Sequence, residues 1–141
     1  MSIKPVIQEE ISGCGIAASA ALAGVSYAQA KAVANGLGIY AEDKVLWSET
    51  AYVRRLLNEF GITCAATELP FSSWEKLPER ALLAIKWRLI DGRPFWHWVV
   101  FVRNGEDSFV LDSKKSLKCH RRRDFGRIKP KWYIPISGNC R

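Results

Sequence analysis

The 141-residue sequence lacks several features that would assign it to a well-marked class of protein. Its four cysteines form no C-x-x-C pair, and it has no internal repeat or low-complexity segment. Its apolar runs are too short to cross a bilayer, and residues 1–10 contain no apolar segment typical of a secretory signal. We therefore expect a soluble, cytoplasmic protein with reduced cysteines, no membrane insertion and no metal or cofactor, unless a non-standard route exports it.

The composition is that of a folded globular protein. Hydrophobic residues make up 48% of the chain and charged residues 25%, which argues against disorder. A chain of this length fits one compact domain, and it buries enough surface on folding to need no disulfide or metal. We expect a single domain over residues 1–141.

The net charge of +7 is concentrated near the C-terminal end. Residues 113–141 hold ten Lys and Arg against one acidic residue, a net charge of +9, whereas residues 1–112 sum to −2. We call residues 114–131 the basic segment. Such a segment attracts an acidic partner, a nucleic acid or an anionic surface, or it is simply a solvated loop. We expect it to select or tether a partner and to take no part in catalysis.

The first half of the sequence predicts three helices, over residues 14–23, 26–35 and 48–60. The first is rich in alanine and closes at Gly24, a residue that favours the left-handed end of a helix. The third places apolar residues at helical spacing and charged residues on its other side, which predicts that one face packs against a core.

The second half alternates with a period of two and is rich in β-branched and aromatic residues, which predicts strands. These strands cover residues 81–87, 95–103, 108–112 and 131–136. Asp91-Gly92 and Asn104-Gly105 are typical hairpin turns, and Pro135 favours a position near a sheet edge for the last strand. Helices followed by an antiparallel sheet predict an α+β fold.

Cys14 begins the first predicted helix and stands between Gly13 and Gly15. The free N–H groups and the positive end of a helix dipole favour thiolate over thiol at this position. We attribute the two glycines to the space that a carbonyl carbon needs when it approaches the sulfur. The competing interpretation is an inert, buried helical cysteine.

His97 and Asp112 lie on neighbouring predicted strands. A two-residue turn at Asn104-Gly105 would place His97 directly opposite Asp112, on the same face of the hairpin. A carboxylate beside an imidazole in an apolar strand pair is costly unless the two groups form a hydrogen bond. We therefore expect a pair in which Asp112 orients His97, although a histidine among aromatic residues is more often part of the core.

Gln8 precedes Cys14 by six residues, and its amide can donate to a developing oxyanion. In this order and spacing, Gln8, Cys14-Gly15, His97 within a hydrophobic strand, and Asp112 resemble the papain-like cysteine peptidases. The resemblance covers about residues 6–112. It is nearest to the bacterial branch of leader-processing domains from bacteriocin exporters, the double-glycine leader peptidases.

This resemblance implies a papain-like fold, with N-terminal helices packed on a C-terminal antiparallel sheet. It implies Cys14 as nucleophile, His97 as base, Asp112 as the residue that orients the base, and Gln8 as oxyanion donor. The function implied is that of a cysteine hydrolase that cleaves a peptide or amide bond of a peptide or protein through a thioester on Cys14. The same groups also serve deamidases, deconjugating enzymes and transferases. Ser113 departs from the family pattern, in which a proline often follows the aspartate.

Three other functions compete with this one. The cleft could hold a peptide without cleaving it, as a catalytically inactive binding domain. The basic segment could bind an anion or a nucleic acid, with Trp132 and Tyr133 as stacking surfaces. Cys119, His120 and Cys140 could bind a metal, but a fourth ligand and a suitable spacing are missing.

Overall fold

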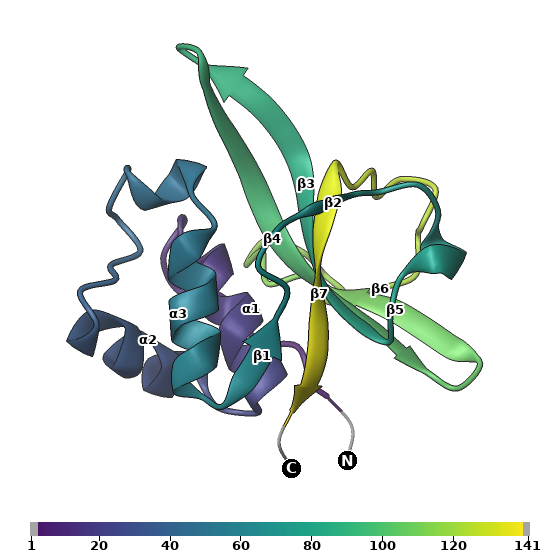
Figure 1. Ribbon diagram of the computed structural model, residues 1–141, viewed down its shortest axis with the longest axis horizontal. Coiled ribbons are helices and arrows are strands. Elements are labelled where there is room, and N and C mark those ends of the chain that lie inside the picture. The colour runs from purple at the N-terminus through teal and green to yellow at the C-terminus, as the bar shows by residue number, and fades with distance from the viewer. Residues whose placement is uncertain (1–2, 140–141) are drawn as a thin grey trace.

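The computed structural model describes residues 3–139, in which three helices cover one face of a seven-stranded antiparallel sheet (Figure 1). The helices are α1 (Cys14–Ala23), α2 (Tyr27–Gly36) and α3 (Ala51–Glu59), with the short 3-10 turns η1 (Leu46–Ser48) and η2 (Trp74–Lys76). The strands are β1 (Ile62–Cys64), β2 (Leu69–Pro70), β3 (Arg80–Ile90), β4 (Arg93–Asn104), β5 (Asp107–Leu111), β6 (Arg121–Arg122) and β7 (Trp132–Asn139). The predicted α+β class is confirmed. Over the same residues, no helix combines the length and apolar character that a bilayer crossing requires.

The helices form close to where the sequence predicts them. Helix α1 has the predicted bounds and ends at Gly24, whose φ of 73° is left-handed. Helix α2 begins after Ser26, which exchanges two hydrogen bonds with Gln29 in a capping box. Helix α3 begins later than predicted, at Ala51, because Glu49 has an extended backbone that separates the helix from η1.

Strand β7 lies next to the edge strand β1, near the sheet edge as Pro135 predicts, and is itself paired on both sides. The strand order is β1-β7-β3-β4-β5-β6, and β2 also pairs with β7. The carbonyl of Pro135 accepts a hydrogen bond from the N–H of Ala65, just beyond the end of β1 and before β2 begins. The nitrogen of a strand residue points to the same side as its carbonyl. The missing N–H of Pro135 therefore faces an interruption in the ladder and costs no strand pairing.

The β4–β5 hairpin turns one residue later than predicted. Asn104 pairs with Asp107, so Gly105 and Glu106 form the turn, and the φ of 62° at Gly105 fits the first central position of a type II′ turn. The pairing then runs to Val100 and Leu111, where β5 ends. The expectation that His97 stands directly opposite Asp112 is therefore wrong by two residues. Because side chains alternate between the two faces of a strand, a register error of two residues leaves His97 and Asp112 on the predicted face.

Hydrophobic side chains cover both faces of the sheet. On the helix side, Trp98 and Val100 of β4 belong to one core with residues of α1, α2 and α3. On the other side, Val99 and Phe101 pack with η2 and with Ile128 of the basic segment, and η2 lies across the sheet from the helices in Figure 1. Burial on both sides holds β4 as a rigid support for His97.

Candidate active site

A pocket of about 500 Å³ opens between the start of α1 and strand β4, and Gln8, Cys14 and His97 all line it. Aromatic side chains of η1 and β4, including Trp47, Phe95 and Trp96, form part of the wall. Asp112 lies behind His97 and is only 1% exposed. The structure thus brings together all four residues that the sequence singles out.

Cys14 is the first residue of α1, and no side chain caps that helix end. Its Sγ accepts a hydrogen bond from the backbone N–H of Trp98, at 3.5 Å, and the side chain is only partly buried. The helix N-terminus and this N–H both place positive electrostatic potential on the sulfur. The Cys14 sulfur therefore lies in a positive field at the pocket.

His97 joins Cys14 to Asp112. Its Nε2 lies 2.7 Å from Oδ1 of Asp112, which leaves Nδ1 for the thiol. The Oδ1 atom also accepts the N–H of Lys114 at 3.1 Å, and the N–H of Asp112 donates to the carbonyl of His120 at 2.9 Å. Asp112 is thereby held on several sides, and the hydrogen bond to Nε2 fixes the orientation of the ring.

The electrostatics favour a charged His97. Burial opposes the charged ring, but hydrogen bonds and charge from Asp112 and Cys14 outweigh burial and raise the pKa of His97 to about 9. Burial also opposes the Asp112 carboxylate, yet its hydrogen bonds and the charge of His97 lower the pKa of Asp112 to about 2. At neutral pH the site therefore holds the His97 imidazolium beside the Asp112 carboxylate.

Gln8 is buried beside this pair, and its amide is fully engaged. Its Nε2 donates to the carbonyls of Glu10 and Ile11, at 3.0 and 2.6 Å, and its Oε1 accepts from the hydroxyl of Ser113, at 2.7 Å. Gln8 therefore braces the loop that leads into Cys14, and Ser113 orients its amide. The role of oxyanion donor stays a prediction for this residue.

The two glycines around Cys14 make room for tyrosines, which the sequence-based explanation missed. A Cβ at Gly13 would overlap with the hydroxyl of Tyr27, and a Cβ at Gly15 would overlap with the ring and hydroxyl of Tyr52. Both tyrosines are buried, and the hydroxyl of Tyr52 accepts a hydrogen bond from the indole of Trp98 at 3.1 Å. The glycines thus let α1 sit close to its neighbours and place Cys14 at the pocket.

Replacing Gly13 with alanine is expected to destabilise the fold by about 1–3 kcal/mol, the usual cost of overpacking a filled core. Denaturant unfolding of Gly13→Ala measures this loss. Gly36→Ala is the matched control, because nothing lies within 4 Å of its added Cβ, and it should be neutral or slightly stabilising. Adding Tyr27→Phe to Gly13→Ala should recover part of the loss, since the overlapping oxygen is removed. Equal stability of Gly13→Ala and the wild type would contradict this packing.

The basic segment reaches the site, while the expectation that it takes no part in catalysis stays a prediction. Arg122 donates to Oδ2 of Asp112 at 2.9 Å and also pairs with Asp124. Lys114 and Lys115 line the same pocket as Cys14. The two lysines follow Asp112 so closely in sequence that their proximity was predictable. Arg122 is positioned by the pairing of β5 with β6, and no pattern in the sequence indicates this pairing.

The other described cysteines lie outside the pocket. Cys64 is partly buried in β1, Cys119 is exposed, and neither forms a disulfide. Within residues 3–139 no group of three metal-ligating side chains gathers, and His120 instead places Nδ1 2.8 Å from the carbonyl of Asp112. Cys140, the remaining member of the considered metal site, lies outside the described residues.

Comparison with solved structures identifies the fold. The chain has the α+β papain-like fold predicted from its sequence, and it resembles the double-glycine leader peptidases in structure. A similar solved structure is the crystal structure of a double glycine motif protease from an AMS/PCAT transporter, in complex with the leader peptide. The TM-score is 0.61 at 16% identity, over 98% of this chain and 93% of that one. No family model and no curated protein sequence matches the chain.

Proposed function

We propose that the protein is a cysteine peptidase that cleaves a peptide bond through a thioester on Cys14. The observation that carries this proposal is the geometry of one pocket. Cys14 at a helix N-terminus faces His97, and His97 is held by the buried Asp112 at 2.7 Å. A nucleophile, a base and a group that orients the base are the three parts that acyl transfer requires.

The reaction proceeds in two stages. The Cys14 thiolate attacks the carbonyl carbon, the C–N bond breaks, and the His97 imidazolium gives its proton to the leaving amine, which leaves a thioester. Neutral His97 then takes a proton from water, the hydroxide attacks the thioester, and the acid leaves as Cys14 regains its sulfur charge. Asp112 keeps Nε2 of the ring engaged throughout, so that Nδ1 exchanges the proton.

The oxyanion of each tetrahedral intermediate lies near the start of α1, where the backbone N–H of Cys14 is available. Gln8 is the second donor in this proposal. Its Nε2 reaches the oxyanion by giving up one of its two bonds, to the carbonyl of Glu10 or to that of Ile11. A longer hydrogen bond breaks at lower cost, so the 3.0 Å bond to Glu10 is the one we expect to be exchanged.

A peptide is the proposed substrate class. The similar protease was crystallised in complex with the leader peptide, which supports a peptide substrate for this protein. In this protein Trp47, Phe95 and Trp96 offer an apolar wall for side chains next to the scissile bond. Ile11 is fully exposed on the loop before Cys14 and extends that wall at the pocket mouth.

Selective alkylation tests the proposed nucleophile. A modest dose of iodoacetamide at mildly acid pH should label Cys14 well ahead of Cys64, Cys119 and Cys140, as read by peptide mass spectrometry. Burial raises the pKa of the Cys64 thiol, and Cys119 is an exposed control that lies outside the pocket of His97. Equal labelling of all four cysteines, or an inert Cys14 in the folded protein, would support a non-catalytic peptide-binding domain instead.

A further inference from the structure

Four cationic side chains line the pocket that contains Cys14 and His97. They are Lys86, Arg88, Lys114 and Lys115. Within residues 3–139, none of the four has a carboxylate within ion-pair distance. Of the two glutamates that also line the pocket, Glu10 pairs with Lys31. The other, Glu9, forms no ion pair with any of the four, so cations outnumber carboxylates along this cavity.

Lys86 occupies a strained position in a β-bulge. Ile85 pairs with His97 and Arg88 with Phe95, so two residues of β3 oppose one residue of β4. The φ of Lys86 is 55°, in the left-handed region that favours glycine. Bulges of this kind redirect a side chain and often lie beside functional sites. A lysine at this position carries a conformational cost that its side chain must offset.

The bulge places Lys86 on the pocket that Lys114 also lines. Burial lowers the pKa of Lys86, and the adjacent ammonium group of Lys114 lowers it further. Asp112 is close enough to act on Lys86 through its charge, but it is buried and already bonded to His97 and Arg122. Two ammonium groups that line one pocket, with the nearby Asp112 carboxylate already bonded to other groups, form a site that a further anion would stabilise.

We propose that Lys86 and Lys114 bind a carboxylate of the substrate beside Cys14. The inference rests on the proposed peptidase function and adds a specificity to it: peptides with an acidic group close to the scissile bond are preferred. The carboxylate belongs either to an Asp or Glu side chain or to the C-terminal end of the peptide. Both sources present the same planar anion to the two ammonium groups.

Two small alkylating reagents test the site without knowledge of the substrate. Iodoacetate carries a carboxylate and iodoacetamide is neutral, and both react with the Cys14 sulfur. The rate with iodoacetate divided by the rate with iodoacetamide should be high in the wild type. This ratio should fall about fivefold or more in Lys86→Gln/Lys114→Gln, since a charge interaction near the surface is lost. Because each protein's iodoacetate rate is divided by its own iodoacetamide rate, a general change in the reactivity of Cys14 cancels from the ratio. Raising the salt to about 1 M should lower the wild-type ratio toward that of the variant.

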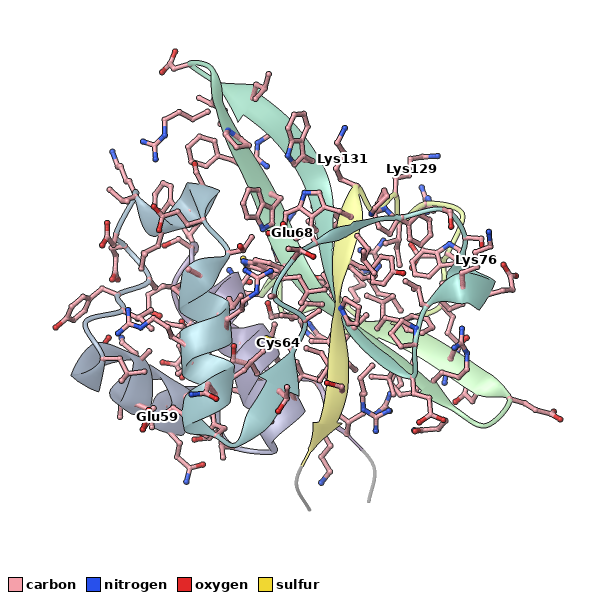
Figure 2. All side chains as sticks on the ribbon, in the orientation of Figure 1. Glu59, Cys64, Glu68, Lys76, Lys129 and Lys131 are labelled. Carbon is pink, nitrogen blue, oxygen red and sulfur yellow. The ribbon has the colours of Figure 1, made fainter. Side chains whose placement is uncertain are left out.

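Matched controls keep the outcome decisive. Lys76→Gln and Lys129→Gln remove the same charge on the far side of the sheet from the helices (Figure 2) and should leave the ratio unchanged. Lys86→Gly removes the charge at a backbone conformation that glycine adopts freely, so it keeps the test valid if glutamine perturbs the bulge. An unchanged ratio in the Lys86 and Lys114 variants would overturn the proposed site. A Cys14 that reacts with neither reagent would instead overturn the peptidase proposal.

Protection of Cys14 from iodoacetamide identifies the source of the carboxylate. Three short peptides differ in whether and where they carry a carboxylate: one with Glu and an amidated end, one with Gln and a free end, and one with Gln and an amidated end. Protection by the first peptide alone assigns the site to an acidic side chain, and protection by the second alone assigns it to a chain end. Equal protection by all three would show that no carboxylate is recognised, which contradicts the proposal.

Discussion

Replacing Cys14 with serine is expected to lower peptide cleavage by about 10⁶-fold, the usual cost of losing the nucleophile of a catalytic triad. A serine hydroxyl stays protonated at neutral pH, so the His97 imidazolium has no thiolate beside it and no acyl-enzyme forms. Cleavage of a mixture of synthetic peptides, followed by mass spectrometry, measures the loss.

Cys119→Ser is the matched control, because Cys119 is exposed and does not line the pocket. This variant should keep the activity of the wild type. Full activity of Cys14→Ser, or equal loss in both variants, would remove Cys14 from the reaction.

The second large effect is expected for Asp112→Asn, which should reduce turnover by at least about a hundredfold without unfolding the protein. Arg122 donates to one oxygen of this side chain, and the asparagine amide would therefore turn its oxygen toward Arg122. The amide nitrogen would then face Nε2 of His97. Two donors cannot bond to each other, so the imidazolium loses its acceptor and its stabilising charge.

Arg122→Gln gives a graded comparison. Glutamine can still donate to Asp112 but carries no charge, so the loss of turnover should be smaller than that of Asp112→Asn. Circular dichroism and thermal unfolding confirm that each variant is folded. A folded Asp112→Asn enzyme with wild-type turnover would show that Asp112 does not orient the base.

The local parts of the fold were predictable from the sequence because their signals lie within a few residues. Ser26 caps α2 and Gly24 ends α1 through interactions with their immediate neighbours. The pair of His97 and Asp112 was predictable for a different reason. The turn was placed one residue too early, and the resulting register error of two preserved the face of each strand.

Features that depend on contacts between distant segments were not predictable. Tyr27 and Tyr52 explain why glycines flank Cys14, yet they belong to other helices. Arg122 reaches Asp112 through the short β5–β6 pairing, and Pro135 is tolerated in a strand paired on both sides because of an interruption in the neighbouring ladder. In each case the three-dimensional arrangement decides the role of the residue, because its type alone is compatible with several roles.

The most direct test of the account is the rate at which iodoacetamide alkylates Cys14 as a function of pH, in the wild type and in His97→Gln. The pKa of His97 is raised to about 9, so the ring stays charged below that pH and its charge is lost as the pH rises through it. Wild-type Cys14 should therefore react rapidly from mildly acid pH upward. In His97→Gln the rapid phase should move up to the range of an ordinary thiol, near pH ~8.5. Identical pH profiles for the two proteins would contradict a thiolate held by His97.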